Sequence, residues 1–422
     1  FMVRSGIDMN SEDRAQQRPF STANFMNGYF KQQNIFAMEV NTDALLSYNN
    51  KFGQDFNFSA SAGANALNRR YNGVNGSVDG LIIPGVFKLS NGRSIPVMST
   101  DYSRKKVHSV YGIASVGFRD KVFLDLTGRN DWSSTLPVEN QSFFYPSVSS
   151  SFILSDIFKM PALISYSKLR LSAAQVGNDT DPYKTRKYYG QSEFPASGSV
   201  PTTLHNVDFK PEITTSYEGG LEARFFKSRL MFDVTLYSNL TKNQILDVPL
   251  DPTSGYSRAV LNAGTVRNQG IEVLLSGSPI QTQNFKWTST LTWAKNANKV
   301  LALADGIEGK QDIGYGGNAT LQARVGGSTG DIYGFGFVRS PDGQIVYTAA
   351  GLPARPAEIQ YIGRAFADWR GGLSNEFSYK NVRFSFLVDG QYGGIVYSQS
   401  HHKMSEQGKL TNTLPGREEG FI

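Results

Sequence analysis

The chain has 422 residues, with 42 basic and 36 acidic side chains that give a formal charge of +6 and are interspersed along the sequence. This mixture favours an ordinary polar surface over nucleic-acid binding, and the absence of cysteine excludes disulfides, thiolate metal sites and cysteine nucleophiles. No run of about 18 apolar residues occurs, which excludes a transmembrane helix, although a membrane-crossing β-strand needs only about ten alternating residues.

The first residues, FMVRSGIDMN, lack the basic start and apolar core of a signal peptide. They are typical of the middle of a β-strand. We therefore expect the chain to be part of a longer protein.

The stretch RDKVFLDLTGRNDW (119–132) alternates between apolar and polar residues. Val122, Leu124 and Leu126 share one face, whereas Asp125 and Arg129 lie on the other, because successive side chains leave a strand on opposite sides. We expect the first face to contact lipid and the second to contact water. The same alternation predicts further strands at 56–62, 110–118, 148–154, 169–173, 217–225, 230–236, 271–275, 285–293, 373–379 and 382–388.

The predicted connections alternate in length. Short links follow residues 51, 119, 154, 226, 278 and 379, and Gly-, Ser-, Asn- and Pro-rich links span 67–105, 132–143, 177–212, 241–267 and 296–370. This rhythm is typical of an up-and-down barrel with short turns at one rim and long loops at the other.

Aromatic residues at strand ends are expected to form the interfacial girdles of such a barrel, and the alternative is that they pack in an ordinary core. They are Tyr48, Phe118, Tyr145, Tyr237, Trp293, Tyr379 and Tyr392. About twelve strands are predicted from Ile35 onward, and thirteen if the first residues contribute. A soluble sandwich is disfavoured because it rarely sorts its loops by length, and the fold class is therefore all-β.

Several long blocks of the sequence resemble SusC/RagA-like TonB-dependent outer-membrane transporters. They include LDLTGRNDWSSTLP, FFYPSVSSSFILSD, KLRLSAAQVGND, AGTVRNQGIEVLL, FKWTSTLTWAKNANKV and GDIYGFGFVRSPDGQIVY, in the order that the family keeps. The resemblance implies a transmembrane antiparallel up-and-down β-barrel that is part of a 22-stranded transporter barrel. Residues 1–422 would form a C-terminal-side portion of it, with the plug domain, the N-terminal region and the final strands outside this chain.

The resemblance also implies a function and partners. We expect TonB-dependent active import of oligosaccharides or oligopeptides across the outer membrane of a Gram-negative bacterium. The implied partners are a SusD-like surface lipoprotein as a lid, TonB through the absent N-terminal region, outer-membrane lipid, and a glycan or peptide substrate. A dimer of transporter–lid pairs is left open, no cofactor or nucleic acid is expected, and a passive porin or a surface adhesin is the alternative.

No catalytic or metal-binding constellation is found in the sequence, so an enzyme is not expected. The adjacent His401 and His402 have no carboxylate at metal-ligand spacing. GGSTGD (326–331) lacks the lysine of a phosphate-binding loop and is interpreted as a flexible glycine turn in an extracellular loop.

Candidate functional residues fall into two groups. Substrate contacts are expected from the loops and the lumen rim, where aromatic faces can stack on sugar rings, at Arg129, Asp131, Trp132, Tyr188, Tyr189, Tyr315, Tyr333 and Trp369. Two alternatives stay open: 129–132 serves the architecture, with Trp132 as an interfacial anchor, and the loop aromatics pack against the lid. Charges expected on the plug-facing wall, in mutual ion pairs or against the plug, are Asp125, Arg170, Glu218, Glu222, Arg224, Asp233 and Glu272.

Overall fold

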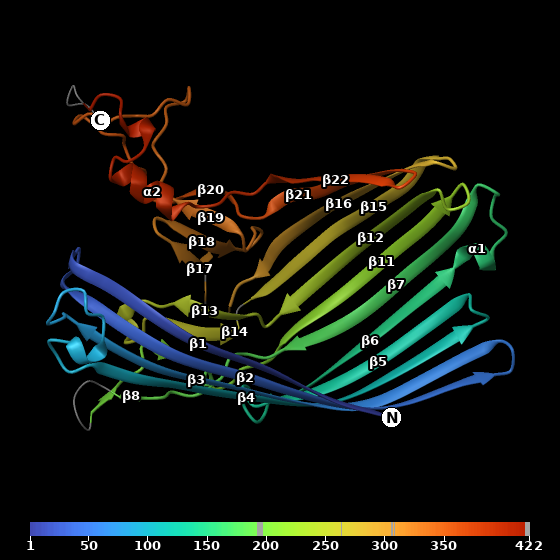
Figure 1. Ribbon diagram of the computed structural model, residues 1–422, viewed down its shortest axis with the longest axis horizontal. Helices are drawn as coiled ribbons and strands as arrows, with labels where there is room; N and C mark the ends of the chain where they lie inside the picture. Colours follow the sequence, from blue (N-terminus) through green and yellow to red (C-terminus); the bar gives the residue numbers. More distant parts are fainter. Residues whose placement is uncertain (192–196, 263, 305–306, 308, 418–422) are drawn as a thin grey trace.

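A computed structural model describes residues 1–191, 197–262, 264–304, 307 and 309–417. Its main feature is an antiparallel sheet of thirteen strands that curls into a trough (Figure 1). In sheet order the strands are β1 (Met2–Thr22), β2 (Phe25–Phe52), β3 (Phe56–Asp79), β4 (Val97–Phe118), β5 (Val122–Ser133), β6 (Ser142–Ile153), β7 (Ile164–Asn178), β11 (Glu212–Phe225), β12 (Leu230–Lys242), β15 (Thr265–Gln281), β16 (Phe285–Ala302), β21 (Ala367–Tyr379) and β22 (Val382–Gly393).

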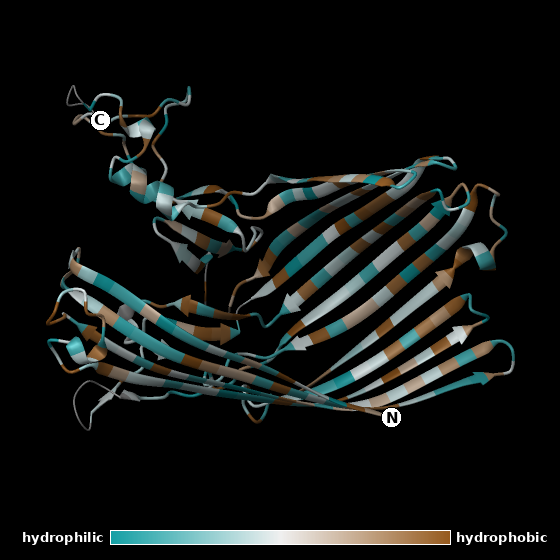
Figure 2. Cartoon of the chain, in the orientation of Figure 1, coloured by the Kyte–Doolittle hydropathy of each residue, from teal (hydrophilic) through white to brown (hydrophobic). Residues whose placement is uncertain are grey.

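The two faces of this sheet differ in polarity, as the alternation predicts. On β5, Leu124 and Leu126 are 39% and 46% exposed on one face, while Asp125 and Arg129 lie on the other because of the strand period of two. The resulting bands of apolar and polar residues cross the strands in Figure 2. We name the side of Asp125 and Arg129 the lumen face and the opposite side the outer face.

The predicted long link 67–105 is wrong in its bounds. β3 continues to Asp79 and β4 begins at Val97, and these two strands pair without a register shift from Phe56↔Phe118 to Ser77↔Val97. The apolar–polar alternation stops near residue 67 because the parts of both strands nearest the β3–β4 link carry polar side chains on both faces. A strand has this pattern where it extends past the hydrocarbon layer into water.

The remaining links confirm the alternation of short and long connections, with one exception. The β1–β2 turn holds two residues, Ala23 and Asn24, at the rim where the long loops lie, and Asn24 takes a φ of 65°. A two-residue hairpin favours such left-handed residues because their twist matches that of the flanking strands. The short links between the other hairpins lie at the right-hand rim of Figure 1.

The described parts of the long links contain secondary structure of their own. One small sheet joins β10 (Thr203–Leu204), β14 (Arg258–Asn262) and β13 (Ile245–Pro249), and another joins β17 (Lys310–Gly316), β18 (Ala319–Arg324), β19 (Asp331–Gly334) and β20 (Gln360–Arg364). β8 (Gly190–Gln191) pairs with β9 (Gly198–Ser199). Short helices are α1 (Leu154–Ile157), α2 (Gln399–Glu406), η1 (Leu89–Asn91), η2 (Pro252–Ser254) and η3 (Thr411–Thr413).

Apolar clusters fix these loop sheets to the ends of the long strands. Leu136, Phe143, Phe209 and Val260 are buried together, so that three different links share one small core. A second cluster joins β15 and β16 to β18 through Val266, Val300 and Ala323. Among the described residues, no helix is long and apolar enough to cross a membrane.

Two of the expected girdle aromatics lie on the lumen face instead. Tyr145 donates a hydrogen bond to Asp131 (2.6 Å), and Tyr237 donates one to Asn296 (3.2 Å). Their strand-end positions suggested a membrane interface, but strand-end position does not fix the face. The registers place the other five, from Tyr48 to Tyr392, on the outer face.

Candidate functional site

A charged network occupies the lumen face of β7, β11 and β12. The Arg170 guanidinium lies 2.6 Å from an Asp233 carboxylate oxygen and 3.7 Å from Glu222. Arg224 contacts the other oxygen of Glu222 at 2.8 Å. The antiparallel registers Glu222↔Asp233 and Gly220↔Arg170 make this possible, because the glycine opposite Arg170 leaves room for its long side chain. Four of the predicted wall residues are thereby brought together.

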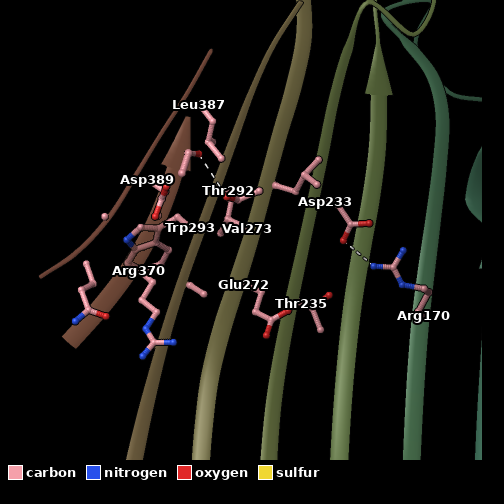
Figure 3. Close-up of a pocket in the computed structure, with 16 residues that line it drawn as sticks. Arg170, Asp233, Thr235, Glu272, Val273, Thr292, Trp293, Arg370, Leu387 and Asp389 are labelled. Carbon is pink, nitrogen blue, oxygen red and sulfur yellow. Dashed lines mark hydrogen bonds and ion pairs between the residues drawn. The ribbon is translucent and has the colours of Figure 1, made fainter. Parts of the chain in front are cut away.

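A hollow of about 960 Å³ adjoins this network on the lumen face (Figure 3). Its lining includes Arg170 and Asp233 at one end and Arg370 and Asp389 at the other, with Glu272 between them. Charged and hydroxyl side chains from β7 to β22 thus project into one space. Such a wall can bind polar groups of a solute or of a protein segment, and it offers no arrangement for covalent chemistry.

A second polar cluster lies on the lumen face near the long-loop rim. Arg129 donates to Asp131 at 2.7 Å and to the Ser109 hydroxyl at 2.7 Å, and the Tyr111 ring lies 5.6 Å from its guanidinium. Asp131 is buried and also accepts the hydrogen bond from Tyr145. Three neighbouring strands are therefore linked through the Arg129–Asp131 pair, which contacts β4 at Ser109 and β6 at Tyr145.

Trp132 and Trp369 do not join Arg129 and Asp131. The pairing Trp132↔Ser142 puts Trp132 on the outer face, and Trp369 stacks on Tyr392 of the same face at 6.1 Å. Both lie near the long-loop rim and are partly exposed. Their placement supports the interpretation of Trp132 as an interfacial anchor, and Trp369 has a matching environment.

The other two predicted wall charges, Asp125 and Glu218, also face the lumen. Asp125 pairs in register with Ser115 and Ser149, and Glu218 accepts a hydrogen bond from Ser216 at 3.1 Å. Both lie outside the network around Arg170.

Tyr188 and Tyr189 lie in the link between β7 and β11, and both are exposed. The Tyr188 ring packs edge-on against Tyr183 at 5.5 Å. The neighbouring Lys187 donates to the Tyr256 hydroxyl and lies over its ring; this hydrogen bond raises the pKa of the Lys187 ammonium. The segment thus presents aromatic faces beside a positive charge.

Tyr315 and Tyr333 belong to the second loop sheet. Tyr315 is exposed and donates to Asp312 at 3.0 Å, and partial desolvation together with this bond raises the pKa of Tyr315. Tyr333 is covered by Arg324, whose guanidinium lies 4.2 Å from the ring, and contacts Tyr361 edge-on. Tyr315 is available to a solute, whereas Tyr333 is occupied by its own sheet.

The GGSTGD segment is a tightly bound turn, so the expectation of a flexible turn is wrong. The Asn298 side-chain oxygen accepts from Thr329 N at 2.8 Å and from the Ser328 hydroxyl at 2.9 Å, and Asp331 accepts from Ser328 N. Its backbone donors are engaged within the protein, which leaves them unable to cradle a phosphate.

The histidine pair is placed in α2, where His402 lies 3.4 Å from the Asn318 amide and 3.7 Å from the Glu406 carboxylate. The expectation that no carboxylate lies at ligand spacing is therefore wrong for His402, because residues four apart on a helix are neighbours. Across the described residues, no group of three or more His, Cys, Asp or Glu side chains is arranged to hold a metal ion.

Sequence reasoning missed a contact that fixes the start of the β7–β11 link. Asp179 follows β7 directly and lies 2.5 Å from Lys105 of β4 and 2.5 Å from the Ser133 hydroxyl of β5. The link therefore crosses over the end of β6 toward β4. An acidic residue immediately after the last strand residue was the available signal, but its partners lie 74 and 46 positions away.

This sheet, with an apolar outer face, a polar lumen face and loops sorted by rim, defines the wall of an outer-membrane β-barrel. Residues 3–409 match the family model described as "TonB dependent receptor-like, beta-barrel". The chain belongs to this family, whose members lie in the outer membrane of Gram-negative bacteria.

Curated relatives agree with this assignment. TonB-dependent receptor P26 of Formosa agariphila is 28% identical over 85% of this chain and 39% of its own length. TonB-dependent receptor SusC of Bacteroides thetaiotaomicron is 25% identical over 70% of this chain and 32% of its own length. The chain thus spans less than half of these relatives, whose names are those of receptors and not of enzymes.

The same fold occurs in a solved structure, that of the RagAB peptide transporter. It superimposes with a TM-score of 0.76 over 92% of this chain and 44% of the solved chain, at 17% identity. At this identity the likeness shows the fold alone. Within the described residues the main sheet is open, because its edge strands β1 and β22 pair with β2 and β21 and not with each other.

Proposed function

We propose that this chain forms part of the barrel of a TonB-dependent importer for oligosaccharides or oligopeptides. In this proposal the long loops capture the solute together with a SusD-like lipoprotein lid. A plug domain contributed by the rest of the protein blocks the lumen until energy transfer from TonB displaces part of it. The protein moves its cargo and changes no covalent bond.

The observation that carries the proposal is the charged lumen wall around the hollow. A plug or a polar oligomer inside a barrel must exchange hydrogen bonds with its wall, because an unpaired polar group in a confined space costs free energy. The charges of Arg170, Asp233, Glu272, Arg370 and Asp389 supply donors and acceptors from five strands between β7 and β22. A second support is the membership in a family of TonB-dependent receptors.

The long-loop side supports capture of oligomers. The long links present the exposed rings of Tyr188 and Tyr189, which precede β8, and of Tyr315 in β17. Aromatic faces stack on sugar rings and contact peptide side chains with large buried area. These residues stay candidates for contact with either the solute or the lid.

Uptake measurements on the full-length protein test the proposal. A deletion strain complemented with the wild-type gene is given a panel of labelled oligosaccharides and oligopeptides, with and without a protonophore. We expect at least one panel member to accumulate only with the gene and only with proton-motive force. Accumulation that persists with the protonophore indicates a passive porin, and surface binding without accumulation indicates an adhesin.

A double variant tests whether the two exposed tyrosines of the β7–β11 link belong to the capture surface. Replacing Tyr188 and Tyr189 by alanine is expected to raise the concentration needed for half-maximal uptake. Tyr379→Ala at the opposite rim is the control, since Tyr379 is similarly exposed but lies beside a short turn. Equal effects of both changes would assign the loss to barrel assembly and not to capture.

A further inference from the structure

Most of the short links contain an aromatic residue that is followed directly in the sequence by a cationic residue, and we call this two-residue unit a step. The step occurs in four of the six short links, as Phe118–Arg119, Phe158–Lys159, Phe226–Lys227 and Tyr379–Lys380. In each case the cation lies in the link itself, beyond the last ladder residue of the preceding strand, and is exposed. The four cations therefore project at one rim of the barrel.

The aromatic member of each step is also exposed. Phe158, Phe226 and Tyr379 are 59%, 55% and 54% accessible. The outer-face apolar stripes begin immediately beyond these links, at Leu230 on β12 and at Val382 on β22. A ring at the edge of such a stripe lies at the boundary between hydrocarbon and headgroups, where aromatic residues are enriched.

The cations differ in how far they are neutralised. Arg119 forms an ion pair with Asp55 at 2.9 Å, and the hydrogen bond that it donates holds the pKa of Asp55 below its usual value. Within the described parts of the chain, Lys159, Lys227 and Lys380 have no ion-pair partner. Lys380 lies over the Tyr379 ring, with its ammonium 5.5 Å from the ring centre.

The two remaining links show that the pattern is not a general excess of lysine. Lys51 and Lys286 also adjoin phenylalanine, but they lie within strands, and the registers Lys51↔Asn57 and Lys286↔Ser378 place both on the lumen face. Among the described residues, Lys121 and Arg229 also lie in short links without an ion pair, but they donate hydrogen bonds to backbone oxygens of neighbouring links. Lys159, Lys227 and Lys380 combine a place in a short link, a preceding aromatic residue and an unpaired charge.

We propose that Lys159, Lys227 and Lys380 bind the phosphates of anionic phospholipids in the leaflet on the short-turn side. Each aromatic neighbour anchors its link in the interface, and the flexible lysine stem lets the ammonium reach the headgroup layer. Attraction between a surface lysine and an anionic leaflet favours association by about fivefold for each charge. The surface thus selects phosphatidylglycerol-type lipids over zwitterionic ones.

This inference is independent of what the protein transports. It concerns the membrane that surrounds the barrel, and the hollow and the loop tyrosines take no part in it. A failure to find a cargo therefore leaves it intact, and a failure of lipid selection leaves the proposed import intact.

The test measures lipid selectivity at the boundary of the full-length protein. The protein is reconstituted in phosphatidylcholine vesicles, and spin-labelled phosphatidylglycerol is compared with spin-labelled phosphatidylcholine by the fraction immobilised at the protein. We expect a preference for phosphatidylglycerol that falls as salt rises, because exposed charges are screened. The variant Lys159→Gln/Lys227→Gln/Lys380→Gln is expected to lose most of this preference, up to about fivefold, because each lysine selects its own lipid.

A control variant with the same change in net charge tests whether the position of the lysines matters. Lys88→Gln/Lys310→Gln/Lys409→Gln removes three exposed lysines from the opposite, long-loop side and is expected to retain the preference. A gel shift on heating confirms that both variants are folded barrels. The proposal is overturned if the short-turn variant retains the preference of the wild type, or if both variants lose it equally.

Discussion

One edge of the sheet, β1–β4, and its middle, β7–β12, build their polar lumen faces from similar ion pairs in different surroundings. On β1–β4, Arg4 contacts Asp43 at 3.3 Å and Arg69 contacts Glu39 at 2.7 Å, but the arginine side chains are 72% and 60% exposed. On β7–β12, Arg170 is 35% exposed and its carboxylate partner Glu222 only 11%. The edge strands β1–β4 carry separate, solvent-exposed ion pairs, whereas the middle strands β7–β12 carry a network in which charged groups share partners.

The comparison shows that the pattern of charges along a strand does not by itself determine how much its ion pairs contribute to stability. Exposed pairs contribute little, because water screens them and ordering two long side chains costs entropy. A pair from which water is partly removed is stronger, and the loss of one partner leaves the other charge unsatisfied. The network around Arg170 should therefore respond to mutation far more than the ladders of β1–β4.

The largest effect is expected for Arg170→Met. The change leaves Asp233 and Glu222 without their shared cation, and we expect the free energy of unfolding to fall by about 2 to 3 kcal/mol. Unfolding of the full-length protein in urea, followed by tryptophan fluorescence, measures it. Lys168→Met, two residues earlier on the same face, is the control, and an equal loss there would break the comparison.

A somewhat smaller effect is expected for Asp131→Asn. The neutral amide keeps the shape but loses the charge-assisted bonds from Arg129 and Tyr145, which should cost about 2 kcal/mol of unfolding free energy. The same urea titration measures the change. Asp125→Asn lies on the same strand and face and should change stability by less than half as much; the reverse order would contradict the proposed role of burial.

A local effect is expected for Asp179→Ala. Removing the carboxylate frees Lys105 and Ser133. We expect hydrogen exchange in the peptides of 179–191 to become about tenfold faster. This corresponds to a fall of about 1.4 kcal/mol in the free energy of local opening, which is the scale of one lost charged hydrogen bond. Asp181→Ala is the control, because its pair with Lys184 lies within the link and is largely exposed. Unchanged exchange in Asp179→Ala would show that other contacts hold the link.

The smallest effect is expected for Arg69→Gln on β3. Its pair with Glu39 is exposed, and its removal should change the free energy of unfolding by less than about 1 kcal/mol. Raising the salt concentration should reduce the difference from the wild type further. A loss as large as that of Arg170→Met would show that the ladders of β1–β4 are as strongly coupled as the network.

Sequence patterns located the elements and the chemistry of the site only in part. The sequence was sufficient to recognise the hairpin turns at 118–123 and 225–230, because apolar–polar alternation and short turns are local properties of the chain. Position near a strand end could not show that Tyr145 faces the lumen while Trp132 faces outward, because one residue of register reverses the face. The bound Asp179 escaped notice for a related reason: its partners on β4 and β5 become neighbours only when β6 and β7 pair.

By itself the sequence determined the all-β class, the sorting of links by length, the polar and apolar faces, and the family that these blocks resemble. Each of these depends on side chains close together in the chain, where the period of a strand and the conformations of turn residues act directly. The tertiary structure alone decided which charges meet around Arg170, how far β3 and β4 extend into water, and that the long loops fold into sheets. Those properties depend on interstrand register and on burial, which arise only when segments distant in the chain pair and exclude water from one another.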